Sequence, residues 1–267
     1  MRLTHTAAIV LRQFYLLRGS LSRVLPLFVW AGIDIVLWGF ITKYLNTVAS
    51  SSLNFVPSLL GAVLLWDFLI RVMQGVTMAF FEDVWSRNFL NIFATPLSIS
   101  EYLSGLVLSS IATSSIGLVV MVVIATALFG LSFFIYGAML VPFFIVLFMC
   151  GIALGIIGSG LVLRLGPPAE WFVWPIPAII SPFVGVFYPL STLPRWMQYI
   201  SLALPPSYVF EGMRAIVSSH ASATHELFWG ACLAVLYILL ACWFFTHVYR
   251  HAVHTGLIAR YSAETLS

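Results

Sequence analysis

Two oppositely charged residues, Asp67 and Arg71, lie four positions apart inside a long apolar stretch of the sequence. Residues at this spacing share one face of a helix, so the carboxylate and the guanidinium can pair. A charge inside a lipid bilayer is energetically costly and is by default a candidate for function. We therefore expect the pair either to fix helix packing or to line a water-filled substrate path. Asp34, in the preceding apolar stretch, has no local partner and is a third candidate for that path.

Three histidines, His247, His251 and His254, recur at i, i+4 and i+7 near the C-terminus. This spacing places three possible metal ligands on one helical face. The same residues come where the last apolar stretch ends, beside Arg250. Basic side chains suit a helix C-terminus and a membrane interface. We favour the interfacial interpretation and expect no metal site.

Small residues recur every fourth position at Gly151, Gly155 and Ser159. A nucleophilic serine of the Gly-x-Ser-Gly kind needs a glycine two positions before it, and that position is Ile157. Small residues at four-residue spacing allow two membrane helices to approach closely. The stripe therefore indicates helix packing and not intramembrane proteolysis.

Lysine occurs once in the chain, as Lys43 in the sequence Phe-Ile-Thr-Lys-Tyr. A phosphate-binding P-loop requires a glycine-rich turn that leads into Gly-Lys-Ser or Gly-Lys-Thr. Since the chain has no such motif, we expect it to be no enzyme and to bind no cofactor itself. If ATP drives this protein, another chain hydrolyses it.

Residues 82–98 form a mixed polar and apolar segment between two apolar stretches. Its apolar residues recur at three- and four-residue steps, at Trp85, Phe89, Ile92 and Phe93. This pattern predicts a short amphipathic helix that Pro96 ends. The helix is either an ordinary interfacial connection or a docking element for a partner.

A second unusual segment follows the fifth apolar stretch. Its residues are apolar enough to enter a membrane, but prolines such as Pro189 and Pro194 exclude one continuous helix. Irregular backbone at membrane depth is tolerated only where protein or a cavity covers it. We therefore expect a re-entrant helical hairpin over residues 194–226, in which Glu211 and Arg214 pair at i and i+3.

The composition of the whole chain predicts the kind of fold that positions these residues. The chain is 61% hydrophobic and 8% charged, whereas soluble domains carry about 25% charged residues. It is therefore an all-α integral membrane protein, with one transmembrane domain over residues 1–267 and no basic block for nucleic acid. Residues 3–18 predict an amphipathic interfacial helix. Spans of roughly 20 residues are expected at 25–43, 55–81, 103–129, 133–163, 171–193 and 227–247.

Basic residues beside the spans predict the orientation. Six crossings place both termini on one side, which receives eight basic residues: Arg2, Arg12, Arg18, Arg23, Arg87, Arg164, Arg250 and Arg260. The opposite side receives three: Lys43, Arg195 and Arg214. Both termini are therefore expected in the cytoplasm.

Three features in chain order resemble the membrane subunit of ABC type-2 export permeases. Pro-Leu-Ser-Thr-Leu-Pro at 189–194, Leu-Pro at 204–205 and Tyr-Val-Phe-Glu-Gly-Met-Arg at 208–214 resemble the signature before that family's last span. Thr-Pro-Leu-Ser at 95–98 resembles the end of its coupling helix. The plan of an interfacial helix, six spans and a broken fifth region is also similar.

The resemblance implies a type V exporter-like permease in a bacterial inner membrane. Two copies, as a homodimer, would form the substrate path, and two separate ATPase subunits would supply ATP and Mg²⁺. The hairpin would cap the path on the outer side, at Pro189, Pro194, Glu211 and Arg214. The ATPase-coupling interface would contain Glu82, Asp83, Trp85, Arg87 and Phe89.

Two other functions fit the residues. The charged residues of the spans, Asp34, Asp67 and Arg71, could couple a proton gradient to transport in a secondary transporter. The C-terminal histidines could instead serve a membrane enzyme or an assembly factor that transports nothing.

Overall fold

The computed structural model describes residues 2–48, 56–86, 88, 91–92, 94–219 and 223–256, and most of these residues are helical and none lies in a strand. This confirms the all-helical fold class. The α-helices are α1 (Leu3–Arg18), α2 (Leu21–Val48), α3 (Gly61–Trp85), α5 (Ile99–Phe129), α6 (Leu140–Leu165), α7 (Glu170–Val173), α8 (Ile176–Val184), α9 (Arg195–Ser201), α10 (Pro205–Ser219) and α11 (Thr224–His254). A π-helical turn, Val56–Leu60, leads into α3, and a 3₁₀ segment, Phe133–Met139, leads into α6.

Five helical stretches of the described residues are long and apolar enough to cross a membrane. They are Phe28–Val48, Ser58–Trp85, Ile99–Phe129, Phe133–Leu165 and Thr224–His254. Each overlaps a predicted span, and the chain is a multi-pass membrane protein.

The predicted span at 171–193 has a different form from the other five. It contains two short helices, α7 and α8, with Pro175 between them. Gly185 follows α8 in the left-handed conformation, with φ at 68°, which stops the helix. No single helix of spanning length therefore forms there, and the sixth crossing is still a prediction.

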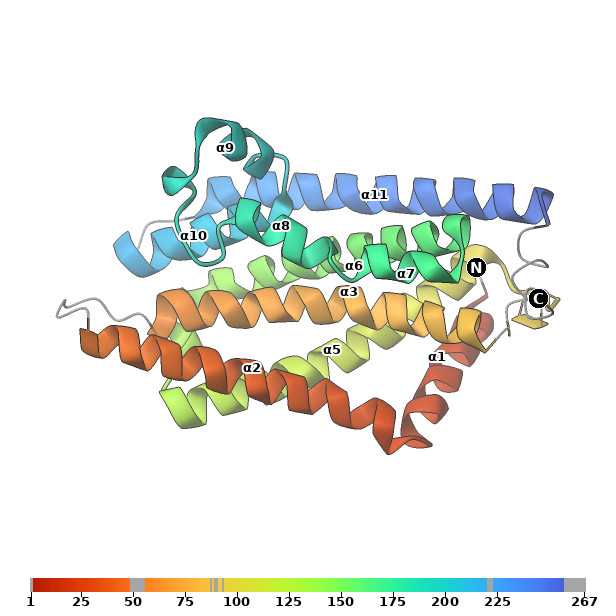
Figure 1. Cartoon of the computed structure of the whole chain (residues 1–267), viewed down its shortest axis with the longest axis horizontal. Coiled ribbons are helices and arrows are strands. Elements are labelled where there is room, and N and C mark those ends of the chain that lie inside the picture. Colours follow the sequence, from red (N-terminus) through yellow and green to blue (C-terminus); the bar gives the residue numbers. More distant parts are fainter. Residues whose placement is uncertain are drawn as a thin grey trace.

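The start of α1 and the end of α11 lie at the same end of the bundle, which we call the N/C end (Figure 1). Helix α1 lies across the bundle there, whereas the long helices run along it (Figure 1). The other end, which we call the far end, carries α9 and the start of α11. An orientation of α1 across the bundle axis is typical of an interfacial helix.

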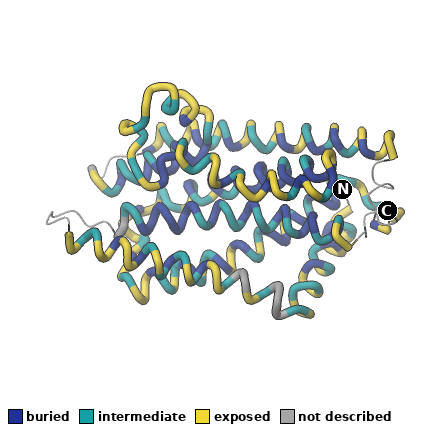
Figure 2. Tube along the Cα trace, in the orientation of Figure 1, coloured by how far each residue is buried: buried dark blue, intermediate teal, exposed yellow. Residues whose placement is uncertain are grey.

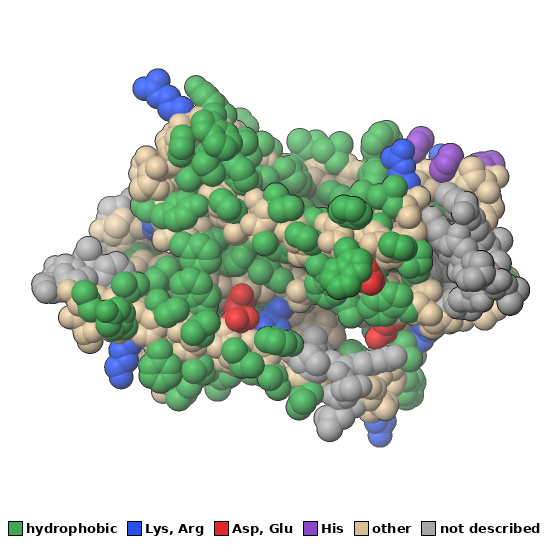
Figure 3. Space-filling view, viewed as in Figure 1, with side chains coloured by type: hydrophobic (Ala, Val, Ile, Leu, Met, Phe, Trp, Pro, Cys, Tyr) green, Lys and Arg blue, Asp and Glu red, His purple; other side chains and the backbone are tan. Residues whose placement is uncertain are grey.

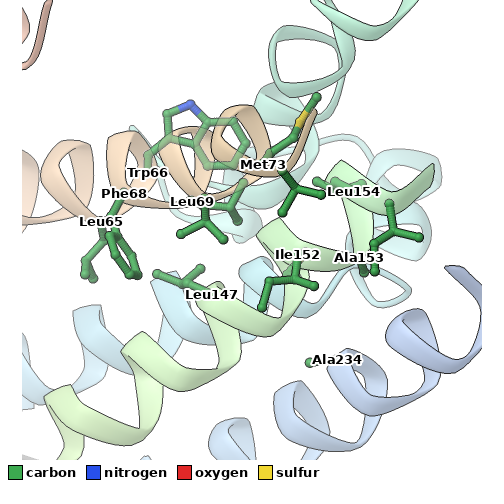
Figure 4. Close-up of a cluster of buried hydrophobic side chains, with 14 of the residues drawn as sticks. Leu65, Trp66, Phe68, Leu69, Met73, Leu147, Ile152, Ala153, Leu154 and Ala234 are labelled. Carbon is green, nitrogen blue, oxygen red and sulfur yellow. The ribbon is translucent and has the colours of Figure 1, made fainter. Parts of the chain in front are cut away.

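Helix α3 is the centre of the bundle, with α5 and α6 packed against it. Buried residues follow α3 along most of its length, while α2 and α11 present exposed outer faces (Figure 2). In the close-up, Leu65 and Leu69 of α3 lie near Leu147 of α6, and Ala234 of α11 lies on the other side of α6 (Figure 4). In a membrane this close packing, and not burial from water, holds helices together.

The small-residue stripe lies in the contact between α6 and α3. A Cβ atom added at Gly151 would lie 2.8 Å from Val72 Cβ, and one added at Gly155 would lie 2.8 Å from Val76 Cβ. Ser159 is buried, and its hydroxyl donates to the carbonyl oxygen of Gly155 on its own helix at 2.9 Å. The two glycines thus let the backbones of α3 and α6 approach closely.

Candidate functional site

One buried carboxylate joins three helices at the N/C end. Asp83, in the last turn of α3, accepts hydrogen bonds from the Arg12 guanidinium of α1 and, at 2.7 Å, from the Tyr102 hydroxyl of α5. Asp83 and Tyr102 are both fully buried. We call this group the Arg12–Asp83–Tyr102 junction.

The charge state of the junction follows from its surroundings. Burial lowers the pKa of Arg12, whereas the hydrogen bond to Asp83 and its negative charge raise it, and the net direction is upward. Arg12 therefore keeps its positive charge. Each carboxylate oxygen of Asp83 thus accepts a hydrogen bond, one of them from a charged donor, so α1 is fastened to α3 and α5.

A second contact ties the start of α1 to the start of α5. Ser98 and Glu101 form a capping box, in which the Glu101 carboxylate accepts from the Ser98 backbone N–H at 3.0 Å. The same carboxylate accepts from the Arg2 backbone N–H at 2.6 Å and lies 3.0 Å from His5 Nδ1. The cap of α5 is thus also an anchor for the N-terminus.

A third contact links α3 to the broken fifth region. The indole N–H of Trp85, at the end of α3, donates to Glu170 Oε2, at the start of α7, over 3.0 Å. The last turn of α3 therefore contacts α1, α5 and α7 through Asp83 and Trp85.

The structure differs from the predicted coupling helix over 82–98 at the N-terminal end of that segment. Residues Glu82–Trp85 continue α3, because nothing breaks the helix there and the Ser86 N–H still donates to the Glu82 carbonyl at 3.0 Å. Two predicted interface residues, Arg87 and Phe89, lie outside the described residues.

The structure brings the three charged residues of the spans together. Asp34 of α2 interacts electrostatically with both Asp67 and Arg71 of α3. Arg71 extends toward α5, where a Cβ added at Gly117 would lie 3.5 Å from its Cδ atom. Asp67 Oδ2 is buried and has no hydrogen-bond partner among the described residues. The two carboxylates and the guanidinium form one group, which we call the intramembrane cluster.

The predicted pair of Glu211 and Arg214, at the far end of the bundle, is also formed. Arg214 Nη1 donates to Glu211 Oε1 at 2.5 Å, and Arg214 Nη2 donates to the Gly185 carbonyl oxygen. Glu211 Oε1 also accepts from the Leu190 N–H at 2.9 Å. The pair therefore fastens α10 to the chain that follows α8.

The two prolines predicted to belong to this hairpin lie at turn and helix starts. Pro189 precedes the 3₁₀ turn Leu190–Thr192, and Pro194 precedes α9. Helices α9 and α10 occupy most of residues 194–219 and are joined by three residues.

The sequence matches the ABC-2 type transporter family over residues 6–218. The chain belongs to the ABC-2 type transporter family. The match extends from α1 to α10 and so includes the junction, the intramembrane cluster and the Glu211–Arg214 pair. The protein is thus the membrane permease of an ABC transporter, a class that works with an ABC ATPase subunit. A comparison with curated proteins found no match.

Several residues that build the permease's N/C end were not predicted as site residues: Arg12, Tyr102, Glu101 and Glu170. The sequence carries a signal for one of them, because Ser98 and Glu101 have the Ser-x-x-Glu spacing of a capping box. From the sequence, Arg12 is only one of the basic residues that predict the orientation of the chain in the membrane. Its partner lies 71 residues away along the chain, so no local pattern reveals the pair.

Replacing Arg214 of this ABC-2 permease by glutamine should destabilise it by about 1–3 kcal/mol. The change removes a charged hydrogen bond to the half-buried Glu211 and the donor to the carbonyl oxygen of the buried Gly185, and lost hydrogen bonds of these kinds together cost about this much. Thermal unfolding of the purified protein in detergent measures the loss. Arg195→Gln is the matched control, because Arg195 is exposed. Equal melting temperatures for the two variants would contradict the prediction.

Proposed function

We propose that two copies of this permease form the substrate path of an exporter, and that two separate ATPase subunits drive it from the N/C end. The observation that carries the proposal is the Arg12–Asp83–Tyr102 junction. It joins a helix that lies across the bundle to the central helix α3 and to α5. The N/C end would face the cytoplasm of a bacterial inner membrane.

The junction supports a specific division of roles within the predicted coupling interface. Asp83 is fully buried, so its role is to transmit movement of α1 to α3 and not to touch the ATPase. Glu82 is half-buried and Trp85 is 49% exposed. These two residues, with Arg87 and Phe89, are the ones we assign to contact with the ATPase. ATP and Mg²⁺ would bind to that subunit and not to this chain.

The substrate path would run between the two permeases, beside α2, α3 and the broken fifth region. The intramembrane cluster of Asp34, Asp67 and Arg71 would line it, because charges in a bilayer are retained where they face a polar path or a partner. The hairpin of α9 and α10 would close the path at the far end, held by Glu211 and Arg214.

The other two functions have less support. A proton-coupled secondary transporter would use the same cluster, but the comparisons give it no support. A metal-dependent role for the C-terminal histidines has no structural support either. Among the residues described here, no group of three or more histidine, cysteine or acidic side chains is placed to hold a metal ion.

The test is reconstitution of the permease with its ATPase. The tagged permease is purified from native membranes, and a co-purifying subunit is identified by its P-loop sequence. The complex in proteoliposomes should hydrolyse ATP faster than the ATPase alone. Replacing Trp85 by alanine should lower this stimulation several-fold, since it removes an exposed contact and the bond to Glu170.

Trp243→Ala is the matched control for this experiment. Trp243 is 68% exposed on α11, and no hydrogen bond of its indole to α7 is among those of the described residues, unlike the bond of Trp85 to Glu170. The proposed coupling would be overturned if Trp85→Ala and Trp243→Ala stimulated ATP hydrolysis equally. Transport driven by an ion gradient without any ATPase would overturn the proposed function itself.

A further inference from the structure

An acidic residue on α2 lies between two tryptophans on the same helical face. Trp30, Asp34 and Trp38 follow one another at four-residue steps, and residues at this spacing are neighbours along a helix. Trp30 is 62% exposed and Asp34 is half-buried. The Trp38 ring stacks on Phe187, with ring centroids 4.9 Å apart and planes inclined by 14°.

This aromatic stripe lies next to the intramembrane cluster. Asp67 and Arg71 are an i, i+4 pair on α3, and Asp34 interacts electrostatically with both. The cluster therefore holds two carboxyl groups and one guanidinium. Asp67 Oδ2 is buried without a hydrogen-bond partner among the described residues, so part of this acidic group is unsatisfied.

Asp34 and Arg71 are half-buried, so the cluster is not sealed inside the bundle. In the space-filling view an acidic and a basic side-chain group lie side by side among hydrophobic side chains near the middle of the face (Figure 3). The surface is hollowed beside them (Figure 3). A ligand in the bilayer can therefore reach the charges without unfolding a helix.

The chemistry of this place selects its ligand. A carboxylate in a low-dielectric setting attracts a cation strongly, and tryptophan faces add cation–π attraction. Ca²⁺ and Mg²⁺ need about six oxygen ligands, and Zn²⁺ needs three or four protein ligands, which two carboxylates beside indole rings do not supply. An organic cation with an apolar body satisfies the charge, the aromatic faces and the surrounding lipid together.

We propose that Asp34, flanked by Trp30 and Trp38, is the binding carboxylate for a monovalent organic cation with an apolar body. Phe187, from the chain after α8, closes the aromatic side of this site. The proposal rests on the proposed function in one respect, because the site serves transport only if the substrate path runs beside α2 and α3.

Two ions of the same shape and opposite charge provide the test. Tetraphenylphosphonium is a lipophilic cation, and tetraphenylborate is its anionic counterpart. Saturable binding of each to the full-length permease in lipid nanodiscs is measured by equilibrium dialysis with radiolabelled ion. We expect the cation to bind saturably and at least about tenfold more tightly than the anion, because the Asp34 carboxylate attracts a cation and repels an anion.

Variants assign that preference to particular residues. Asp34→Asn should weaken cation binding by about tenfold or more, while Asp34→Glu should retain it. Trp30→Leu should weaken binding by about fivefold through the lost cation–π contact. Trp243→Leu, another exposed tryptophan, should change nothing, and neither should Glu226→Gln in the first turn of α11.

The possible results separate this site from the proposed function. The site is overturned if Asp34→Asn binds the cation like the wild type, if the anion binds as tightly, or if neither ion binds saturably. Because the assay contains no ATPase, it does not depend on coupling. A permease that binds the cation but is not driven by ATP would overturn the proposed function alone.

Discussion

Replacing Arg12 by alanine should destabilise the permease by about 3–5 kcal/mol. The Asp83 carboxylate is fully buried, and without Arg12 it would keep only the Tyr102 hydroxyl as a partner among the bonds of the junction. Removing one partner of a buried ion pair typically costs this much, because the other charge is left uncompensated. The free energy of unfolding, from detergent–SDS titration of the purified protein, measures the loss.

Two further variants test whether the loss of stability comes from the Arg12–Asp83–Tyr102 junction. Arg18→Ala removes an exposed arginine from the last turn of α1 and should cost less than about 0.5 kcal/mol. The double variant Arg12→Ala/Asp83→Ala should lose clearly less than the sum of the single losses, because residues in contact are coupled. Additive losses, or an Arg12→Ala effect as small as that of Arg18→Ala, would show that the pair does not join α1 to α3.

How far the fold follows from sequence is clearest at α1. The structure has a helix over the same residues, 3–18, that the apolar spacing predicts. The apolar residues that recur at helical spacing in α1 do not all face the bundle, however, because two of them, Leu11 and Phe14, are 54% and 55% exposed. The buried face carries Thr6, Ile9 and Gln13 instead. Lipid favours the same apolar side chains as a protein core, so periodicity predicts the helix but not which face packs.

The α1 contact with α5 shows what decides the packing face. A Cβ added at Gly105 of α5 would lie 2.6 Å from Ile9 Cβ. The missing side chain at Gly105 therefore admits Ile9, and the neighbouring turn brings Arg12 to Asp83. This match of shapes between distant segments is absent from any local pattern.

The charged residues show the same difference between local contacts, which the sequence predicts, and contacts between distant segments, which it does not. The pairs Asp67–Arg71 and Glu211–Arg214 are local, so their spacing alone predicts that each can meet. Asp34 meets the first pair only because α2 and α3 both pack against α5. The prolines predict the broken fifth region. The hydrogen bond between Trp85 and Glu170 depends on where the start of α7 lies relative to the end of α3, and no local pattern predicts that.

Replacing Gly151 by alanine should destabilise the permease by up to about 3 kcal/mol, although alanine favours helices. The added Cβ would lie 2.8 Å from Val72 Cβ and 2.9 Å from the Leu69 carbonyl oxygen, and neither atom can move without shifting α3. Overpacking a tight core typically costs about 1–3 kcal/mol. This exceeds the gain in helix propensity, which is about 0.5–1 kcal/mol.

Gly32 of α2 offers the matched control, because replacing it by alanine should raise stability where the Gly151→Ala change lowers it. A Cβ added there would meet only Ile124 Cδ1, at an ordinary distance of 3.8 Å. Gly32→Ala should therefore keep the propensity gain and raise the unfolding temperature slightly, while Gly151→Ala lowers it. Both are measured by thermal unfolding in the same detergent. If both variants were stabilised, α3 and α6 would not be held at the close approach that the glycines permit, and movement of α3 would not pass directly to α6.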